Sequence, residues 1–201
     1  NDGVERTYPK YSPDGKEIAF IQDRRKLMVM NLDTKKVRQI TDGSTYPERN
    51  GGFDYKWSPD GKWFVIELTG NGHEPYSDIA IVNATGTPKV TNITRSSYFD
   101  MEPQWVMDGN AIAFVSDRYG LRSHASWGSQ NDIMLAFLNQ DAYDKYRLSK
   151  EDYELRKELE KQQKKDKEKA EKEKSDKKDK KNDDKKEKSA DSDDDTEDIV
   201  V

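Results

Sequence analysis

Cysteine is absent from the 201 residues, so the chain has neither disulfide bonds nor thiolate metal ligands. Its two histidines are isolated from each other and from any metal-binding spacing such as H-E-x-x-H, so we expect no metal and no cofactor. No apolar run approaches the ~18 residues of a membrane-spanning helix, and no signal peptide is recognisable at the first residues. We therefore expect no membrane insertion.

A basic excess is also missing. Residues 151–201 hold 16 Lys/Arg and 20 Asp/Glu, and residues 1–150 hold the remaining 19 and 20. Without a basic domain we expect no nucleic-acid partner. All four Trp lie in the first part, which can bury a core, whereas the second part has few apolar residues and should remain solvated.

A short sequence motif occurs three times and consists of an aromatic residue, a turn that ends in Asp-Gly, and an apolar strand. The Asp-Gly pairs begin at Asp14, Asp60 and Asp108, which are 46 and then 48 residues apart. The first two turns read Ser-Pro-Asp-Gly, in which Pro presets φ, Asp bonds to nearby backbone and Gly accepts a positive φ. In the third turn Val106-Met107 replaces Ser-Pro, and we expect that turn to be less rigid.

Further strands that are rich in β-branched residues follow each copy of the motif. Second strands are expected at 27–30, 79–82 and 133–137, and short third segments at 37–41 and 90–94. About four antiparallel strands in a unit of about 45 residues is the pattern of a propeller blade. The predicted fold is all-β, a partial β-propeller of about three four-stranded blades over residues 1–140. A plain β-meander or sandwich is the alternative.

The aromatic residues before the turns have a fixed place in the repeat. We therefore predict that Tyr11, Trp57 and Trp105 form core between neighbouring blades. Three blades are too few to close a ring, because natural propellers use about four to eight. We expect a piece of a larger propeller, with uncovered strand edges at its first and last blades.

The charged end should begin as a helical extension over residues 141–165. Asp141 is expected to cap a first helix, and Ser149 to open a second one in a capping box with Asp152. Glu and Lys four residues apart support a fraying helix to about residue 172. We expect a low-complexity, disordered insertion or linker over 166–198, and the start of a further strand at 199–201.

The charged stretch also permits two binding roles. Its lysine-rich part could bind an acidic partner, and the acidic run 191–195 could bind cations weakly. Because the two signs alternate and cancel, a solvated spacer is the favoured interpretation.

Two parts of the sequence resemble known families. Ser-Pro-Asp-Gly-Lys before an apolar strand resembles the TolB-type propeller repeat. The run from Ser116 to Asp152, which opens with Ser-Asp-Arg-Tyr-Gly, resembles the propeller region of bacterial tricorn-protease homologues, where a Lys/Glu-rich insertion follows. Val106-Met107 departs from the repeat.

The resemblance implies a non-catalytic propeller portion of a tricorn-like serine peptidase, acting as a substrate gate or a peptide-docking scaffold. Its partners would be peptides or proteins and the remaining peptidase domains of the parent, which could be a homo-oligomer in the periplasm. The alternative is a TolB-like protein-interaction propeller with no peptidase activity.

The sequence offers no catalytic residues, because neither a G-x-S-x-G elbow nor a nucleophile with a matched base is present. A propeller hydrolase with a central metal is disfavoured by the two isolated histidines. Binding is the better expectation for the long link 118–131. Its candidate binding residues are Arg118, Tyr119, Arg122, His124 and Trp127. Alternatively, Trp127 packs against a neighbouring blade and the arginines pair with local acids.

Overall fold

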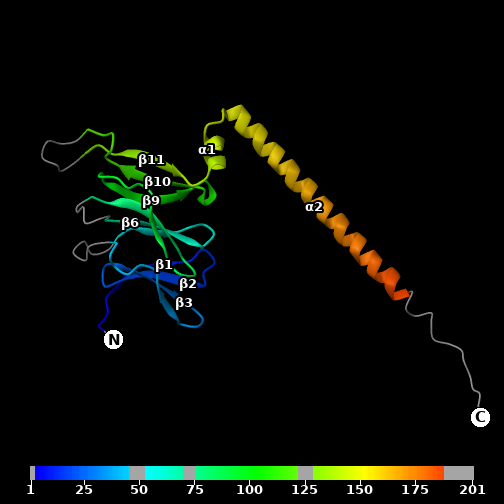
Figure 1. The fold of residues 1–201 in the computed structure, drawn as a ribbon, viewed down its shortest axis with the longest axis horizontal. Helices are drawn as coiled ribbons and strands as arrows, with labels where there is room; N and C mark the ends of the chain where they lie inside the picture. The colour runs from blue at the N-terminus through cyan, green and yellow to red at the C-terminus, as the bar shows by residue number, and fades with distance from the viewer. Residues whose placement is uncertain (1–2, 46–52, 70–75, 122–128, 188–201) are drawn as a thin grey trace, which may run out of the picture. The chain divides into compact units, whose positions relative to one another are not determined.

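Three antiparallel sheets follow one another along the chain in the computed structural model, which describes residues 3–45, 53–69, 76–121 and 129–187 (Figure 1). The first sheet consists of β1 (Arg6–Tyr11), β2 (Glu17–Gln22), β3 (Lys26–Asn31) and β4 (Val37–Gln39). The second consists of β5 (Tyr55–Trp57), β6 (Trp63–Leu68), β7 (Asp78–Asn83) and β8 (Val90–Asn92). The third consists of β9 (Asp100–Val106), β10 (Ala111–Ser116) and β11 (Asp132–Phe137).

The propeller prediction is confirmed. Each sheet is a meander whose strands pair in chain order. The third sheet has three strands among the residues described, where the first two have four. The register repeats as well: Ile18, Phe64 and Ile112 occupy the same position in β2, β6 and β10, opposite equivalent residues of β3, β7 and β11.

The second sheet lies between the other two and is buried on both faces (Figure 1). Phe64 and Ile66 pack toward the first sheet, whereas Val65 and Ile79 pack toward the third. Side chains alternate between the faces of a strand, so a sheet covered on both sides requires a continuous apolar run. This explains why the apolar strand of the second repeat shows no polar alternation.

The first two Asp-Gly turns are held by the serine that precedes them. Ser58 Oγ donates to Asp60 Oδ1 over 2.6 Å and accepts from Trp63 N over 2.9 Å. Ser12 makes the same two bonds, to Asp14 at 2.7 Å and from Glu17 N at 2.9 Å. The serine bond is the main cause that lowers the pKa of Asp60.

The third turn differs, as its sequence predicts. Met107 and Asp108 both adopt positive φ, 52° and 55°, where non-glycine residues are strained. No serine is present at this turn. Instead Asn110 donates twice to Met107 O, from its backbone N at 3.1 Å and its Nδ2 at 2.9 Å.

Connections in a meander alternate between the two ends of the strands. We call the end with the Asp-Gly turns the turn side. We call the opposite end the link side; it carries the links after β2, β6 and β10 and those that enter β5 and β9. Links after the second strand lengthen along the chain, from 23–25 to 69–77 to 117–131. Variable links on a constant scaffold are common places for binding residues.

Hydrogen bonds between sheets also repeat. Trp57 Nε1 donates to Lys10 O over 3.2 Å, and Trp105 Nε1 donates to Lys56 O over 3.1 Å. The predicted place of these two tryptophans between blades is confirmed. The prediction for Tyr11 is wrong in this structure: it is 66% exposed, and within the described residues no sheet packs on that face of the first one.

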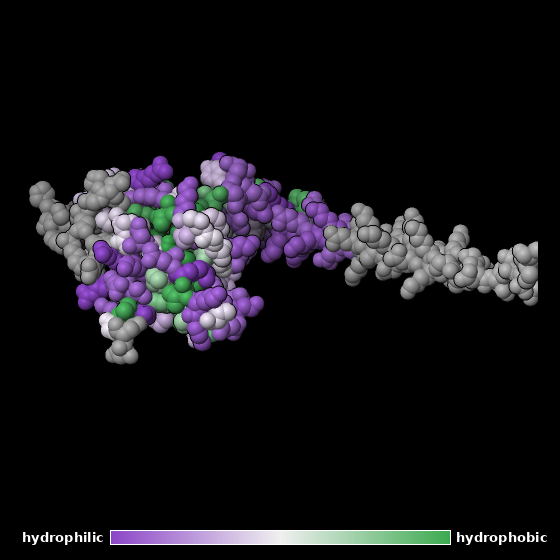
Figure 2. Space-filling model, turned by 60° about the horizontal axis from the view of Figure 1, so that its bottom comes forward, coloured by the Kyte–Doolittle hydropathy of each residue, from purple (hydrophilic) through white to green (hydrophobic). Residues whose placement is uncertain are grey.

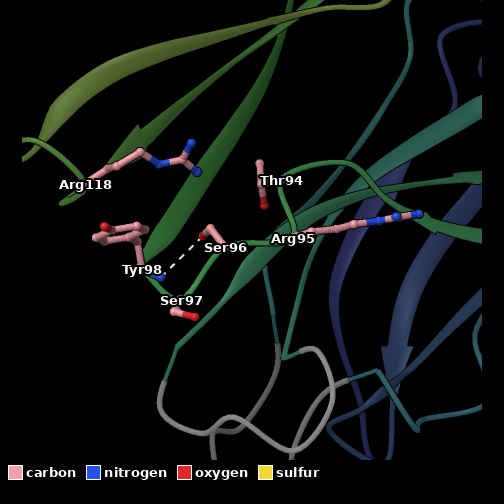
Figure 3. A pocket seen from close by; sticks show the side chains of 6 residues that line it. All are labelled: Thr94, Arg95, Ser96, Ser97, Tyr98 and Arg118. Atoms are coloured by element: carbon pink, nitrogen blue, oxygen red, sulfur yellow. Dashed lines mark hydrogen bonds between the residues drawn. The ribbon is translucent and has the colours of Figure 1, made fainter.

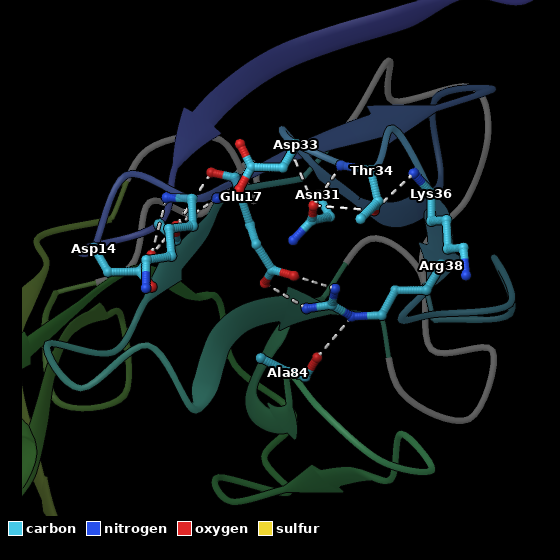
Figure 4. A network of polar contacts seen from close by, with 10 residues as sticks. Asp14, Glu17, Asn31, Asp33, Thr34, Lys36, Arg38 and Ala84 are labelled. Atoms are coloured by element: carbon cyan, nitrogen blue, oxygen red, sulfur yellow. Dashed lines mark hydrogen bonds and ion pairs between the residues drawn. The ribbon is translucent and has the colours of Figure 1, made fainter.

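An ion pair adds to the junction of the first two sheets on the turn side (Figure 4). Arg38 forms two bonds to the Glu17 carboxylate, at 2.5 and 2.6 Å, and its Nε donates to Ala84 O at 3.1 Å. Paired bonds of this kind fix geometry as well as charge. Arg38 therefore joins β2, β4 and the turn after β7.

Two helices follow the sheets. α1 (Gln140–Tyr146) is capped by Asn139, whose Oδ1 accepts from Ala142 N over 2.8 Å. The prediction that Asp141 caps it is wrong, because Asp141 lies inside the first turn. Ser149 caps α2 as predicted: Asp152 N donates to Ser149 Oγ over 3.1 Å, and Ser149 Oγ donates to Asp152 Oδ2 over 2.9 Å.

α2 (Lys150–Glu187) is much longer than the predicted extension to residue 165, or the fraying end near residue 172. Its 38 residues include neither Gly nor Pro, and many Glu–Lys pairs are spaced by four, which favours an extended helix. Figure 2 shows its coloured part as hydrophilic over most of its surface. Residues 199–201 lie outside the described residues. Within the described chain no helix is long and apolar enough to cross a membrane.

The chain forms two compact units, residues 1–144 and 145–201. The first holds the three sheets.

Candidate functional site

A hollow of about 460 Å³ opens on the link side of the second and third sheets (Figure 3). The link from β8 to β9 forms one wall, and Arg118, just after β10, forms another. Its lining residues are Thr94, Arg95, Ser96, Ser97, Tyr98 and Arg118.

Arg118 is held in place by a buried acid and an aromatic ring. Its Nη2 lies 3.4 Å from Asp100 Oδ2, and the Asp100 side chain is 0% exposed. The guanidinium also lies over the Tyr98 ring, 5.4 Å from its centroid, a cation–π arrangement visible in Figure 3. Ser96 Oγ donates to the same Asp100 oxygen over 2.7 Å. Two groups therefore orient Arg118, while Arg95 extends in another direction (Figure 3).

A second buried acid shapes the link itself. Asp78 accepts hydrogen bonds from Asn92 Nδ2 at 2.7 Å, Thr94 Oγ1 at 3.1 Å and Ser96 N at 2.6 Å. These bonds satisfy polar groups that would otherwise be buried without partners. Asp78 thus fixes the wall of the hollow from beneath.

The base of the long link after β10 explains its Asp-Arg-x-Gly sequence. Asp117 Oδ1 accepts from Phe99 N over 3.0 Å, which joins this link to the entry of β9. A Cβ on Gly120 would lie 1.6 Å from the carbonyl oxygen of Gln130, so only glycine fits. Arg118 and Tyr119 lie between Asp117 and Gly120, whose positions are fixed by these two contacts.

The chemistry of the hollow suits binding. Its hydroxyls and two arginines can donate to carboxylates and backbone carbonyls. Asp100 Oδ1 and Arg118 Nε are buried without a hydrogen-bond partner among the described residues. No group of three side chains suited to hold a metal ion is found in the described parts of the chain.

The predicted site residues divide into two groups. Arg118 lines the hollow, and Tyr119 beside it is 73% exposed. Arg122, His124 and Trp127 lie outside the described residues, so their predicted role stays a prediction. Tyr98 and Asp100 were not predicted, since they lie at the entry and the first residue of β9, 18 residues or more before Arg118.

A smaller hollow of about 260 Å³ lies near the first strands β1 and β5, and it brings Lys10, Asp54 and Glu67 together. Lys10 Nζ lies 3.1 Å from Asp54 Oδ1 and donates to Tyr55 O over 2.6 Å. Asp54 also pairs with Lys56 at 3.1 Å. These charges are mutually compensated, so this hollow is the weaker candidate for binding.

Glu67 is the unexpected member of that group. Its carboxylate accepts from Asp54 N at 3.2 Å and from Glu102 N at 2.8 Å, so it joins the second and third sheets. Burial raises its pKa, and the two backbone bonds oppose that rise. It occupies the position that Ile21 has in the first sheet. An acid inside the run Trp-Phe-Val-Ile-Glu-Leu was the available sequence signal.

Comparisons with known proteins agree with this architecture. Residues 5–124 match the family described as the TolB beta propeller domain. The putative tricorn-like protease C-terminal subunit of Sulfurisphaera tokodaii is 34% identical over 110 residues, which are 55% of this chain and 12% of that protein. The Tol-Pal system protein TolB of Bordetella pertussis is 34% identical over 112 residues, 56% of this chain and 24% of that protein.

A solved structure shows the same fold. The crystal structure of the tricorn protease aligns with a TM-score of 0.50 at 15% identity, and the alignment covers 68% of this chain and 14% of that one. The chain thus spans between about a tenth and a quarter of the length of these proteins. Since the match to the family covers more than half of the residues, the chain belongs to the TolB beta propeller domain family.

Proposed function

We propose that this chain is a non-catalytic propeller region of a tricorn-like peptidase, and that it docks or gates peptides on its link side. The observation that carries the proposal is the oriented Arg118, held by buried Asp100 and by Tyr98 at an open hollow. Similarity to tricorn-like proteins supports the peptidase context. Cleavage itself would occur in another part of the longer polypeptide.

The site would bind a peptide through its acidic groups and carbonyls. The guanidinium of Arg118 keeps donors beyond the one that faces Asp100, because the group has five. Among the residues that line the hollow, two are arginines and none is an acid, whereas Asp78 and Asp100 lie buried behind them. We therefore expect extended peptides with Asp or Glu side chains or a free carboxyl end to bind better than neutral ones.

Fluorescence anisotropy tests this with labelled octapeptides that differ only in their number of Asp residues and in a free or amidated end. Arg118→Lys keeps the charge but loses the planar fork, and it should weaken binding roughly tenfold. Arg24→Lys is the matched control, because Arg24 follows β2 as Arg118 follows β10 and pairs with Glu5 at 3.2 Å. Equal affinities of both variants, or no binding at all, would overturn the proposal.

The second candidate is a protein-interaction propeller without peptidase activity, favoured by the 34% identity to TolB of Bordetella pertussis. Both candidates use the same hollow. Peptide hydrolysis by the complete polypeptide separates them: hydrolysis supports the first candidate, and a stable polypeptide complex without hydrolysis supports the second.

A periplasmic location and a homo-oligomeric parent belong to the same proposal and rest on the resemblance to tricorn-like and TolB proteins. Fractionation of cells that express the complete polypeptide tests the location, and light scattering of the purified polypeptide tests the oligomer. Cytoplasmic material and a monomer would contradict these two parts separately.

A further inference from the structure

The smaller hollow, beside β1 and the entry of β5, contains an acid without a counter-ion. Asp54 pairs with Lys10 and with Lys56, each over 3.1 Å. The carboxylate of Glu67 accepts from two backbone N–H groups, and among the described residues it forms no ion pair. A carboxylate can accept about four hydrogen bonds. Glu67 is therefore a charged acceptor that a cation in the hollow can still bind.

The hollow is built by the first two sheets, each of which has four strands. Its lining residues come from β1, from the entry of β5 and from β6, and they are Tyr8, Lys10, Phe53, Asp54 and Glu67. None of them lines the hollow at Arg118. The two hollows are therefore separate candidate sites.

Two β-bulges meet at this hollow. In each of them two residues, Tyr8-Pro9 in the first sheet and Glu102-Pro103 in the third, stand opposite a single residue of the neighbouring strand. Tyr8 and Glu102 both adopt positive φ, 53° and 54°. Tyr8 lines the hollow, and Glu102 N donates to Glu67 over 2.8 Å. Bulges re-aim side chains and strained residues gather at binding sites, so both features favour a ligand here.

The position of Tyr8 is fixed from the second sheet. Its carbonyl oxygen accepts from Tyr55 Oη over 2.5 Å. Lys10 Nζ lies 4.5 Å from the centroid of the same Tyr55 ring and donates to Tyr55 O over 2.6 Å. Tyr55 is 0% exposed, so it holds both walls of the hollow from within the core.

The lining of the hollow fits an alkylammonium group. Glu67 and Asp54 can accept from its three N–H donors. Tyr8 and Phe53 supply aromatic surface for the methylene chain and for the charge. Two carboxylates against one lysine disfavour an anion. A calcium ion takes about six to eight oxygen ligands, and no group of three side chains suited to a metal is found in the described parts of the chain.

We propose that this hollow binds an alkylammonium group, with Glu67 accepting from the ammonium and with Tyr8 and Phe53 against the methylene chain. A lysine side chain or the amino end of a polypeptide presents this group. Lys10 limits the affinity, because it carries the same charge as the ligand. The inference does not rest on the peptide site at Arg118.

The charges around Glu67 make the binding depend on pH. Burial raises the pKa of Glu67, its two backbone bonds oppose that rise, and Asp54 and Glu102 add repulsion. Lys10 and Lys56 face the same group through Asp54. A cation in the hollow favours the charged form of Glu67, so it should lower this pKa. By linkage, the affinity for the cation should increase as Glu67 loses its proton.

An NMR titration of the full chain with n-butylammonium chloride tests the proposal, at an ionic strength held constant with sodium chloride. The amide shifts of Asp54 and Glu102 should change and saturate, whereas those of residues 94–98 and Arg118 should stay constant. n-Butanol, which lacks the charge, should cause no change. Constant shifts at Asp54 and Glu102 overturn the proposal. Calcium chloride that saturates the same shifts at lower concentration also overturns it, because the site would then be a metal site.

Two substitutions should act in opposite directions. Glu67→Gln should weaken butylammonium binding about tenfold, because it removes the charged acceptor. Lys10→Met keeps the length of the side chain but removes the like charge, and it should strengthen binding about threefold. Misfolding cannot produce tighter binding. Glu5→Gln is the matched control, because Glu5 is an exposed acid that pairs with Arg24 over 3.2 Å. Equal affinities of Glu67→Gln and Glu5→Gln would overturn the proposal, as would Lys10→Met binding no tighter than the parent.

Proton linkage and competition complete the test. Between about pH 4 and pH 7 the affinity should rise more steeply in the parent than in Glu67→Gln, and equal slopes would contradict the role of Glu67. Two short peptides identify the source of the ammonium. One has an acetylated amino end and a single lysine, and the other has a free amino end and norleucine in place of the lysine. Displacement of butylammonium by the first assigns a lysine side chain, and displacement by the second assigns an amino end. Displacement by neither overturns the inference.

Discussion

The two junctions between neighbouring sheets share one hydrogen bond from a tryptophan side chain to a backbone carbonyl but differ in other side chains. Tryptophan from the later sheet bonds a lysine carbonyl of the earlier one in both. Between the first and second sheets, the Ile21 position is apolar and fully buried. Between the second and third, Glu67 takes that position, and the link side holds the buried Asp100. The shared part maintains the fold, and the departures from it create the candidate binding site.

The largest effect is expected in the apolar junction. Phe64 is 0% exposed, and its ring lies 4.1 Å from that of Trp57 and 6.0 Å from that of Tyr55. Phe64→Ala should lower the free energy of unfolding by about 3–5 kcal/mol, because it removes packing and leaves a cavity. Urea denaturation followed by tryptophan fluorescence measures this loss.

Ile18→Ala is the matched control, because Ile18 has the same register position on the half-buried outer face of the first sheet. Ile18→Ala should lower the free energy of unfolding clearly less than Phe64→Ala does. An equal loss would show that the outer face is covered as fully as the junction, contrary to the comparison.

A smaller effect is expected in the polar junction. Glu67→Ala leaves the N–H groups of Asp54 and Glu102 without their acceptor. The free energy of unfolding at pH 7 should fall by about 1–2 kcal/mol, because two hydrogen bonds to a charged acceptor are lost while the exposed N–H of Glu102 regains a bond to water. Denaturation measures the change, and an unchanged stability would mean that Glu67 does not join the two sheets.

A still smaller loss of stability is expected from a substitution in the turns on the turn side. Ser58→Ala removes one donor and one acceptor that hold the second turn, and it should cost about 1 kcal/mol. Thr87→Ala, on an exposed turn, should stay within about 0.5 kcal/mol of the parent. Thermal unfolding of both variants checks this. A loss for Ser58→Ala no larger than for Thr87→Ala would contradict the role of the serine.

The smallest effect is expected in the pH dependence of the free energy of unfolding. Burial raises the folded pKa of Glu67 above its ordinary value of 4.5, despite its two backbone bonds, and Asp54 and Glu102 add repulsion. The folded state then holds the proton more tightly, so this contribution is fully present below pH 4.5 and is lost as pH rises through the folded pKa. Relative to Glu67→Gln, the parent should gain stability as the pH falls across this range. Parallel curves for the two proteins would contradict the raised pKa.

The sequence predicts the repeated part of the fold well, because that part is local. Ser-Pro-Asp-Gly defines its own turn through bonds between residues two to five apart, as in Ser58. The same holds for the Ser149 cap of α2, whose partner Asp152 is three residues away. Tyr11 shows the limit: its burial depends on contact with a neighbouring sheet, and none of the described sheets packs on it.

The candidate site was predicted only in part, for the same reason. Arg118 stands out in its long link, but its partners are Asp100, the first residue of β9, and Tyr98, in the link that enters β9. Which acid meets which arginine follows from the register of β9 against β10 and not from either segment alone. The contacts of Glu67 could not be predicted either, because the two N–H groups that donate to its carboxylate come from two different sheets.

Mapping a bound acidic octapeptide by NMR tests the central claim most directly. The account predicts that amide shifts change at residues 94–98 and at Arg118, on the link side, and that the turn around Ser12 and Ser58 stays unperturbed. Changes confined to the turn side, or none at saturating peptide, would contradict a peptide-docking role for this propeller region.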